Sequence, residues 1–160
     1  ERFAWALQKG TEIGASVFEP LVTERTIVDD LHTLEGKRER WQRIIQEAAE
    51  QSGRGRAPLL LPGQLFRSAV KSSAQSDALR LIPWEGEHTQ TLTAALAEYD
   101  LATRPRVELF VGPEGGFTEA EIDWAQRHGV KPVTLGARVL RAETAGLVAA
   151  AAILYHVGEF

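Results

Sequence analysis

The stretch that decides the fold runs from Val107 to Ala152 and reads VELFVGPEGGFTEAEIDWAQRHGVKPVTLGARVLRAETAGLVAAAA. Two glycine-bearing loops, GPEGGF and TLGARVLR, each follow a short apolar run and lead into a helix-like segment. Such loops present bare backbone N–H groups and a helix N-terminus to a ligand. In a parallel sheet, two loops one βα unit apart reach the same edge. The stretch therefore predicts a pocket at the carboxyl ends of parallel strands.

Apolar spacing on both sides of this stretch predicts an alternation of helices and strands. The clearest helix covers 34–51, where Trp41, Ile44, Ile45, Ala48 and Ala49 form one apolar stripe. The other expected helices cover 2–13, 62–74, 92–99, 119–128 and 142–157, and the expected strands cover 17–22, 78–82, 107–111 and 133–135. This order indicates one α/β domain with a mostly parallel sheet.

Two of the expected helices carry specific signals. Thr118 and Glu121 have the spacing of a capping box at the start of the helix over 119–128. Gly129 closes that helix, and His128 fits a C-terminal cap partner better than a catalytic base. The final helix is alanine-rich and apolar on all sides, so we expect it to be buried.

Length and composition bound the class of protein. With 160 residues and a net charge of −4, the chain suits one compact domain with a sizeable core. Cysteine is absent, which excludes disulfides and thiolate metal sites. The longest apolar run, Leu147 to Tyr155, is far shorter than the ~20 residues that span a bilayer, and no signal peptide is visible. We expect a cytoplasmic protein without a membrane partner. Methionine is absent too, and we expect that an upstream segment is missing.

Several kinds of chemistry are excluded or weakened. GPEGGF is neither a Walker A loop nor a GxGxxG fingerprint, because the required lysine or glycine spacing is missing. The chain has no HExxH motif and no GxSxG elbow, and its four histidines are scattered, so we expect no metal site and no covalent nucleophile. What remains is a backbone-lined pocket for a nucleotide-like ligand, near Glu114, Arg138, Arg141 and Glu143.

A basic segment lies on an otherwise acidic chain. Between Lys37 and Arg56 there are six basic residues against three acidic ones. A solvated helix face is the favoured interpretation, and a phosphate-contacting patch is the alternative. In that alternative, Gln51 and Arg54 at the helix terminus would hold RNA backbone or a base edge.

The motifs VGPEGGFTEAEI and LGARVLRAETAGLVAAA, together with ALQKGTEIG, PLVTERT and RWQRIIQEAAEQSGR, cover nearly the whole chain. In this order they resemble the RsmE family of 16S ribosomal RNA uridine-N3 methyltransferases, which belongs to the SPOUT class. The resemblance implies an α/β domain over 1–160 with helices on both faces of a mostly parallel sheet and a C-terminal trefoil knot. It also implies bound S-adenosylmethionine, a homodimer with the site near the subunit interface, and a missing N-terminal PUA-like RNA-binding domain.

The resemblance further implies residue roles. Three loops would hold S-adenosylmethionine, through Ile82, Pro83, Gly112, Glu114, Gly115, Gly116, Leu135, Gly136, Leu140 and Arg141. Arg141 and Glu143 would be catalytic, with Glu143 or Glu114 assisting loss of the uridine N3 proton; a surface salt bridge or a helix N-terminal charge is the alternative. The residues facing small-subunit ribosomal RNA would be Lys9, Arg25, Gln51, Arg54 and Arg138.

One departure from the family pattern and two rival functions stay open. Where the family often has threonine after the final arginine, this chain has Ala142, so a hydroxyl contact is lost there. One rival is another SPOUT enzyme that methylates transfer RNA or a ribose 2′-hydroxyl. The other is a non-catalytic RNA-binding module of the same fold.

Overall fold

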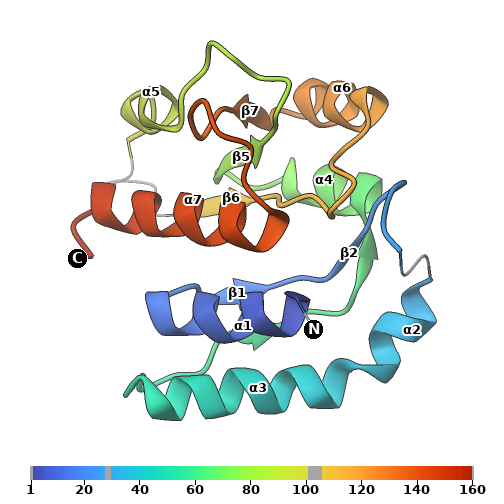
Figure 1. Cartoon of the computed structure of the whole chain (residues 1–160), viewed down its shortest axis with the longest axis vertical. Helices are drawn as coiled ribbons and strands as arrows, with labels where there is room; N and C mark the ends of the chain where they lie inside the picture. Colours follow the sequence, from blue (N-terminus) through green and yellow to red (C-terminus); the bar gives the residue numbers. More distant parts are fainter. Residues whose placement is uncertain (1, 28–29, 101–105, 160) are drawn as a thin grey trace.

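A computed structural model describes residues 2–27, 30–100 and 106–159, and from β4 (Gln64–Leu65) onward its strands and helices alternate along the chain (Figure 1). Every described strand pair is parallel. The elements are α1 (Arg2–Ile13), β1 (Val17–Phe18), β2 (Leu21–Val22), α2 (Leu31–Gly36), α3 (Arg38–Gln51), β3 (Leu59–Leu60), β4 (Gln64–Leu65), α4 (Phe66–Ser73), β5 (Leu79–Pro83), α5 (Leu92–Ala97), β6 (Val107–Leu109), α6 (Glu119–Arg127), β7 (Lys131–Val133) and α7 (Ala142–His156).

The C-terminal half is built on a three-stranded sheet in the order β6-β5-β7. Leu79 pairs with Val107 at one end of β5, and Pro83 pairs with Val133 at the other. The alternating side chains of β5 enter two separate cores. Ile82 packs with α4 and α6, whereas Leu81 packs with α5 and α7. Helices therefore cover both faces of this sheet, as expected.

The N-terminal half has its own core around α1, α2 and α3. Leu7 and Ile45 are its most buried side chains, and Trp41 packs edge-on against Phe3. The strands of this half form two separate pairs, β1 with β3 and β2 with β4. The expected single sheet is therefore wrong in detail, because three small parallel sheets take its place.

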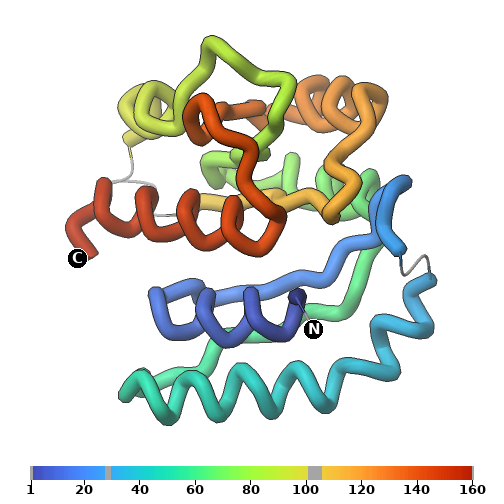
Figure 2. The backbone as a smooth tube through the Cα atoms, in the orientation of Figure 1, coloured from blue at the N-terminus to red at the C-terminus, as the bar shows by residue number. Residues whose placement is uncertain are grey.

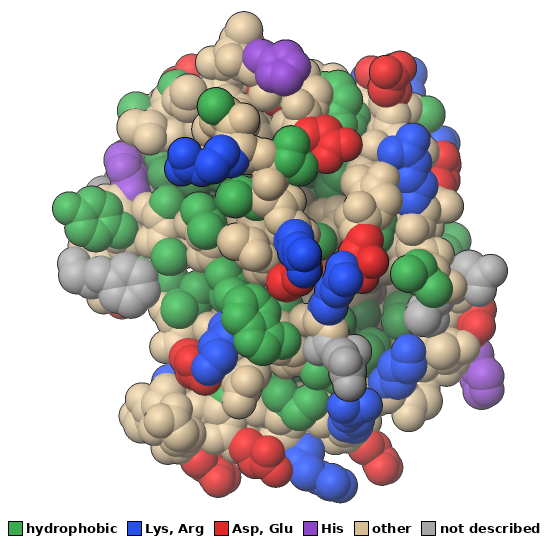
Figure 3. All heavy atoms as spheres, viewed as in Figure 1, with side chains coloured by type: hydrophobic (Ala, Val, Ile, Leu, Met, Phe, Trp, Pro, Cys, Tyr) green, Lys and Arg blue, Asp and Glu red, His purple; other side chains and the backbone are tan. Residues whose placement is uncertain are grey.

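The two halves lie one above the other in Figure 2. Residues of both halves line a cleft of about 1810 Å3. Side chains of α1 and β1 line one wall, and β6 and α7 supply residues of the other. β1 pairs with β3, and Val17 and Phe18 of β1 line the cleft together with Val107 and Glu108 of β6. On the face shown in Figure 3, apolar side chains line a hollow between the halves, and charged groups lie at its rim.

Two expected helix boundaries are wrong. The helix expected over 34–51 is two helices, which meet at Lys37. The first begins earlier than expected, because the Asp30 carboxylate accepts a hydrogen bond from the Thr33 amide at 2.6 Å and caps it. The helix expected from residue 62 begins only at Phe66, since Gln64–Leu65 pairs with β2 as strand β4.

Strands β3 and β4 were not predicted from the sequence, and β7 was predicted at a shifted position. β3 and β4 have two residues each, too few for a hydrophobic period, and their partners lie more than 40 positions away in the printed register. β7 lies two residues before the expected 133–135 and contains Pro132. Because β7 is at the edge of its sheet, a proline there is tolerated.

The final helix was expected to be buried, and most of it is not. Only Ala149 and Ile153 of α7 are buried, while Val148 is 44% and Tyr155 73% exposed. The helix is apolar on all sides and contacts α1, α5 and β5, but Val148 and Tyr155 remain exposed, so part of its apolar surface is uncovered. No helix in the described ranges is long and apolar enough to cross a membrane.

Candidate functional site

Three loops follow three neighbouring parallel strands. The loop from Trp84 follows β5, the loop 112–117 follows β6, and the loop 135–141 follows β7. The strand order β6-β5-β7 places their carboxyl ends at one edge. The Trp84 amide donates to the Val133 carbonyl at 3.1 Å, which holds the first loop beside the third. In an open parallel sheet this edge is the place where ligands bind.

The loop 112–117 is a tight turn anchored in the core. The Gly116 amide donates to the Pro113 carbonyl at 2.9 Å, and Gly116 has φ 69°, a conformation that favours glycine. Phe117 is buried and its ring lies 4.9 Å from that of Phe66. Immediately after it, Thr118 and Glu121 form the predicted capping box of α6, which is confirmed. The loop is therefore held at its far end by both a core residue and a helix cap.

The loop 135–141 leads into α7. Gly136 has φ 107°, and a Cβ added to it would meet no atom within 4 Å. Arg138 and Arg141 are both exposed, and within its described part the structure shows no hydrogen bond or ion pair for either side chain. Arg141 occupies the N-cap position of α7 without a side-chain cap bond. Two free cations and a helix N-terminus therefore lie on one short segment.

Backbone groups of these loops are available to a ligand. The amides of Gly112, Leu135 and Leu140 are in half-buried residues, and within the described ranges no hydrogen-bond acceptor is shown for any of them. Half-buried N–H groups need a partner, which protein, water or a ligand can supply. Together with the open space beside Gly136, this fits a nucleotide-like ligand held by backbone groups.

The start of α1 reaches this site. Arg2 Nη1 lies 2.6 Å from Glu114 Oε1, and Arg2 Nε lies 4.0 Å from Glu143 Oε1. The other oxygen of Glu143, Oε2, is buried and has no hydrogen-bond partner in the structure. A buried carboxylate oxygen without a partner is costly, so a donor from outside the chain would stabilise it. Arg2 was not predicted as a site residue, because no local signal in the sequence marks it.

Two predicted pocket residues contribute differently from the rest. The Ile82 side chain is fully buried in the core with Phe66 and Phe110, so only its backbone can meet a ligand. Gly115 has ordinary backbone angles, and its missing Cβ leaves room for Arg25, whose Cβ would lie 3.1 Å away. A ligand was predicted to come close to the backbone at Gly115. Arg25 occupies that space on at least one side.

The five predicted RNA-facing residues do not form one surface. Arg25 and Arg138 lie at the loops, whereas Gln51 and Arg54 lie at the far end of α3 (Figure 1). Arg54 Nη1 donates to the carbonyls of Thr11 and Ala15, at 2.8 and 2.7 Å, and so joins the end of α1 to the end of α3. Lys9 is paired with Glu12 at 2.8 Å.

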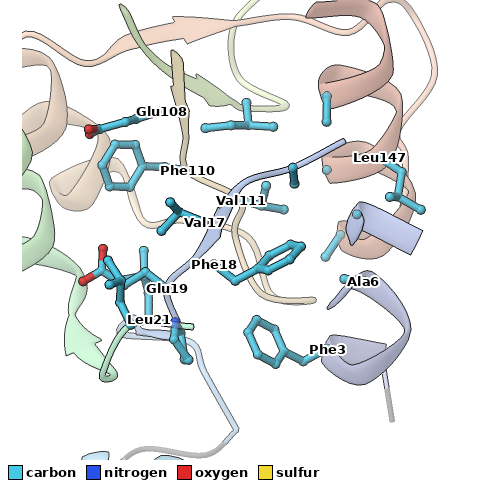
Figure 4. Close-up of a pocket in the computed structure, with 18 of the residues that line it drawn as sticks. Phe3, Ala6, Val17, Phe18, Glu19, Leu21, Glu108, Phe110, Val111 and Leu147 are labelled. Carbon is cyan, nitrogen blue, oxygen red and sulfur yellow. The ribbon is translucent and has the colours of Figure 1, made fainter. Parts of the chain in front are cut away.

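The cleft between the halves differs in character from the loop site. Figure 4 shows Glu19 and Glu108 on either side of the Phe110 ring. Burial, and to a lesser degree the neighbouring Glu108 charge, raises the pKa of Glu19, although Gln64 donates to its carboxylate at 2.5 Å. The described residues contain no group of three His, Asp or Glu side chains that could hold a metal ion. The cleft is larger than a typical small-molecule pocket, and carboxylates line part of it. It therefore does not match one small anionic ligand.

The chain matches the model of the RNA methyltransferase domain over residues 1–154. It is 43% identical over 143 residues to ribosomal RNA small subunit methyltransferase E of Synechocystis sp., covering 89% of this chain and 46% of that protein. It is 36% identical over 158 residues to the protein of the same name from Bacillus subtilis, covering 98% of this chain and 62% of the relative. The chain thus spans about half to three fifths of these curated relatives.

Solved structures agree with these matches. A methyltransferase of Legionella pneumophila in complex with the bound cofactor SAM superimposes with a TM-score of 0.84 at 34% identity, over 98% of this chain and 62% of that one. The ribosomal RNA small subunit methyltransferase E of Neisseria gonorrhoeae bound to S-adenosyl methionine gives 0.83 at 36% identity, over 97% and 61%. Both similarities extend over nearly all of the present chain.

Proposed function

The chain belongs to the RNA methyltransferase domain family, and we propose that it transfers a methyl group from S-adenosylmethionine to N3 of a uridine in small-subunit ribosomal RNA. The observation that carries the proposal is the meeting of three loops at the carboxyl edge of β6-β5-β7, with unpaired amides in two of them. The relatives named for small-subunit methylation and the structures with bound cofactor support it.

In this proposal the donor lies among the three loops. Backbone groups of Ile82, Gly112, Leu135 and Leu140 hold its polar atoms, and Gly136 leaves space for a flat ring. Pro83, Glu114, Gly115, Gly116 and Arg141 complete the proposed donor-binding set. When bound, S-adenosylmethionine supplies a methyl group activated by a sulfonium. The loops contribute orientation, because a transfer between two bound reactants depends mainly on alignment.

Glu143 and Arg141 are the proposed catalytic residues. Glu143 lies in the first turn of α7, and its buried, unpartnered Oε2 is suited to accept the uridine N3 proton. Arg141 is exposed one residue before the helix, so its guanidinium is free to donate hydrogen bonds to carbonyl or phosphate oxygens of the RNA. Glu114, which is paired with Arg2 at 2.6 Å, remains the alternative acceptor.

RNA binding is proposed in two parts. Arg25 and Arg138 lie at the loops and would contact the nucleotides around the target. Lys9, Gln51 and Arg54 lie elsewhere and would contact RNA only along a longer track, with a PUA-like domain of the whole protein contributing the rest. Since phosphate contacts release counterions, affinity should fall steeply with salt.

A homodimer with a trefoil knot completes the proposal. The uncovered apolar face of α7 and the exposed Trp5 on the adjoining α1 support a second copy of the chain as the missing partner. Loops from three adjacent strands at one edge support the knotted arrangement of the SPOUT class. The proposed place of action is the cytoplasm, where ribosomal RNA is available.

Calorimetric titration with S-adenosylmethionine tests the proposal. Gly136→Ala should weaken binding strongly, because the strained φ disturbs the loop and the new Cβ enters the open space proposed for the donor. Gly53→Ala is a matched control, since Gly53 also has a positive φ (70°) and open space but lies after α3. Absence of binding by the folded, wild-type dimer, or equal binding by both variants, would contradict the donor site.

The target is tested separately. Incubating small-subunit ribosomal RNA with the protein and labelled donor, followed by nucleoside analysis, should give N3-methyluridine. Methylation of transfer RNA or of a ribose 2′-hydroxyl would point to another SPOUT enzyme. RNA binding without any donor binding would favour the non-catalytic module.

A further inference from the structure

A four-residue turn between β2 and α2 contacts the glycine loop from 90 positions away in the sequence. The turn, Thr23–Thr26, is held by its own hydrogen bonds: the Thr23 amide donates to Thr26 Oγ1 at 2.9 Å, and the Thr26 amide donates to the Thr23 carbonyl at 3.2 Å. It is therefore a small preformed unit, and its position depends on what anchors it.

The first anchor is a buried carboxylate. Glu121 is 1% exposed; its Oε1 accepts from the Glu24 amide and its Oε2 from the Thr118 amide, both at 2.9 Å. No basic side chain forms an ion pair with Glu121 within the ranges that the structure describes. A buried carboxylate is tolerated only when hydrogen bonds stabilise it, so both amides are needed. This fixes the turn against the start of α6.

The Glu24 side chain strengthens the same junction. Thr118 Oγ1 lies 3.1 Å from Glu24 Oε2, and Arg67 Nη2 of α4 lies 3.2 Å from Glu24 Oε1. The turn is thus joined to the start of α6 by two hydrogen bonds and to α4 by an ion pair. Such a network resists displacement of the turn as a whole.

The second contact reaches the glycine loop itself. Arg25 Nη1 donates to the Gly115 carbonyl at 2.8 Å. A Cβ at Gly115 would lie 3.1 Å from the Arg25 Cβ, so a side chain there would push the arginine back by a few tenths of an ångström. Arg25 is exposed, and its remaining N–H groups are not used by any described residue.

We infer that Arg25 is a positioning residue that holds the 112–117 loop in its donor-binding shape through the Gly115 carbonyl, with Glu121 as the buried anchor of its turn. A loop that is already ordered loses less entropy when a ligand binds. The identity of the donor rests on the proposed function, whereas the ordering of the loop does not.

Two measurements on the same variants test this. Hydrogen exchange of the Gly116 amide, which donates to Pro113, reports loop order without any ligand. In Arg25→Ala the exchange should be about tenfold faster and the affinity for S-adenosylmethionine, measured without RNA, about tenfold lower, since one charge-assisted hydrogen bond is lost. Arg25→Lys, which keeps one donor, should restore part of both effects. Glu121→Gln should act in the same direction, because an amide nitrogen cannot accept a hydrogen bond.

The control is Arg56→Ala, which removes the same charge from an exposed position where the structure shows no partner within its described part. Unchanged Gly116 exchange in Arg25→Ala would overturn the inference whatever happens to donor binding. Faster exchange with unchanged donor affinity would also overturn it. If the wild-type protein bound no S-adenosylmethionine, the proposed function would fail, and the exchange result would still decide whether Arg25 holds the loop.

Discussion

Arg2, at the start of the first helix, lies 2.6 Å from Glu114 on the glycine loop, although the two residues are separated by most of the chain. Its Nε also approaches Glu143 of α7 at 4.0 Å. One cation therefore faces two of the carboxylates at the proposed site. This arrangement makes α1 part of the site as well as part of the N-terminal core.

Arg2→Ala should lower methyl transfer more than stability. Arg2 and Glu114 are each about half exposed, so the pair should contribute less than about 1 kcal/mol to the free energy of unfolding. Loss of the cation would leave Glu114 and Glu143 without their nearest positive charge. Single-turnover methylation and urea unfolding of the same sample measure both effects. Equal losses would indicate a structural role.

Gly116→Ala should destabilise the loop and weaken donor binding. A non-glycine residue in the left-handed conformation costs roughly 1–2 kcal/mol, and the new Cβ would lie 3.3 Å from Glu85 Oε1. Gly55→Ala is the control, because that glycine has ordinary φ and open space around it. Thermal unfolding with and without S-adenosylmethionine measures the two effects. Identical ligand-induced stabilisation of both variants would count against the loop as donor site.

Arg54→Ala should lower stability by about 1–3 kcal/mol, because two carbonyls at the end of α1 lose a charged donor and Thr11 is buried. Arg56→Ala, which removes the same charge two residues later, should have little effect on unfolding. The RNA affinity of both variants, measured at a temperature where both are folded, separates the structural role of Arg54 from its proposed role in RNA binding. A drop confined to Arg54→Ala would support the proposed contact between Arg54 and RNA.

Glu19→Gln should stabilise the protein at neutral pH. The pKa of Glu19 is raised in the folded state, so the folded protein binds the proton more tightly than the unfolded chain does. The favourable contribution of the protonated group is fully present below its ordinary pKa of 4.5 and is lost as pH rises through the raised value. The neutral amide avoids that loss and keeps an oxygen for Gln64. Melting temperatures at pH 4 and 7 should therefore differ less in the variant, and a parallel shift at both pH values would contradict this.

Val148→Asp should dissociate the proposed homodimer. Val148 is 44% exposed on the uncovered face of α7, where a charge would be buried on association. Leu59→Asp is the control, since Leu59 is also exposed (62%) but lies on β3 in the N-terminal half. Sedimentation equilibrium should give a dimer for the wild type and control. A monomeric wild type, or a dimeric Val148→Asp variant, would remove α7 as the interface.

Local sequence signals predicted the elements that local forces decide. The capping box of Thr118 and Glu121 and the apolar stripe of α3 depend on residues three or four positions apart, and both are present. The two glycine loops were placed correctly after β6 and β7 because apolar runs precede them. Strands β3 and β4 were missed because two residues carry no period and their pairing is long-range.

The sequence by itself determined the order of elements, the two glycine loops and the family motifs, because each of these depends on a few neighbouring residues. The tertiary structure alone decided which distant residues share a site. It brought Arg2 to Glu114 and Arg25 to Gly115, directed Arg54 to the end of α1, and left one face of an apolar helix uncovered. The physical reason is that these contacts depend on how separate cores pack, and long-range packing is not encoded in any local spacing.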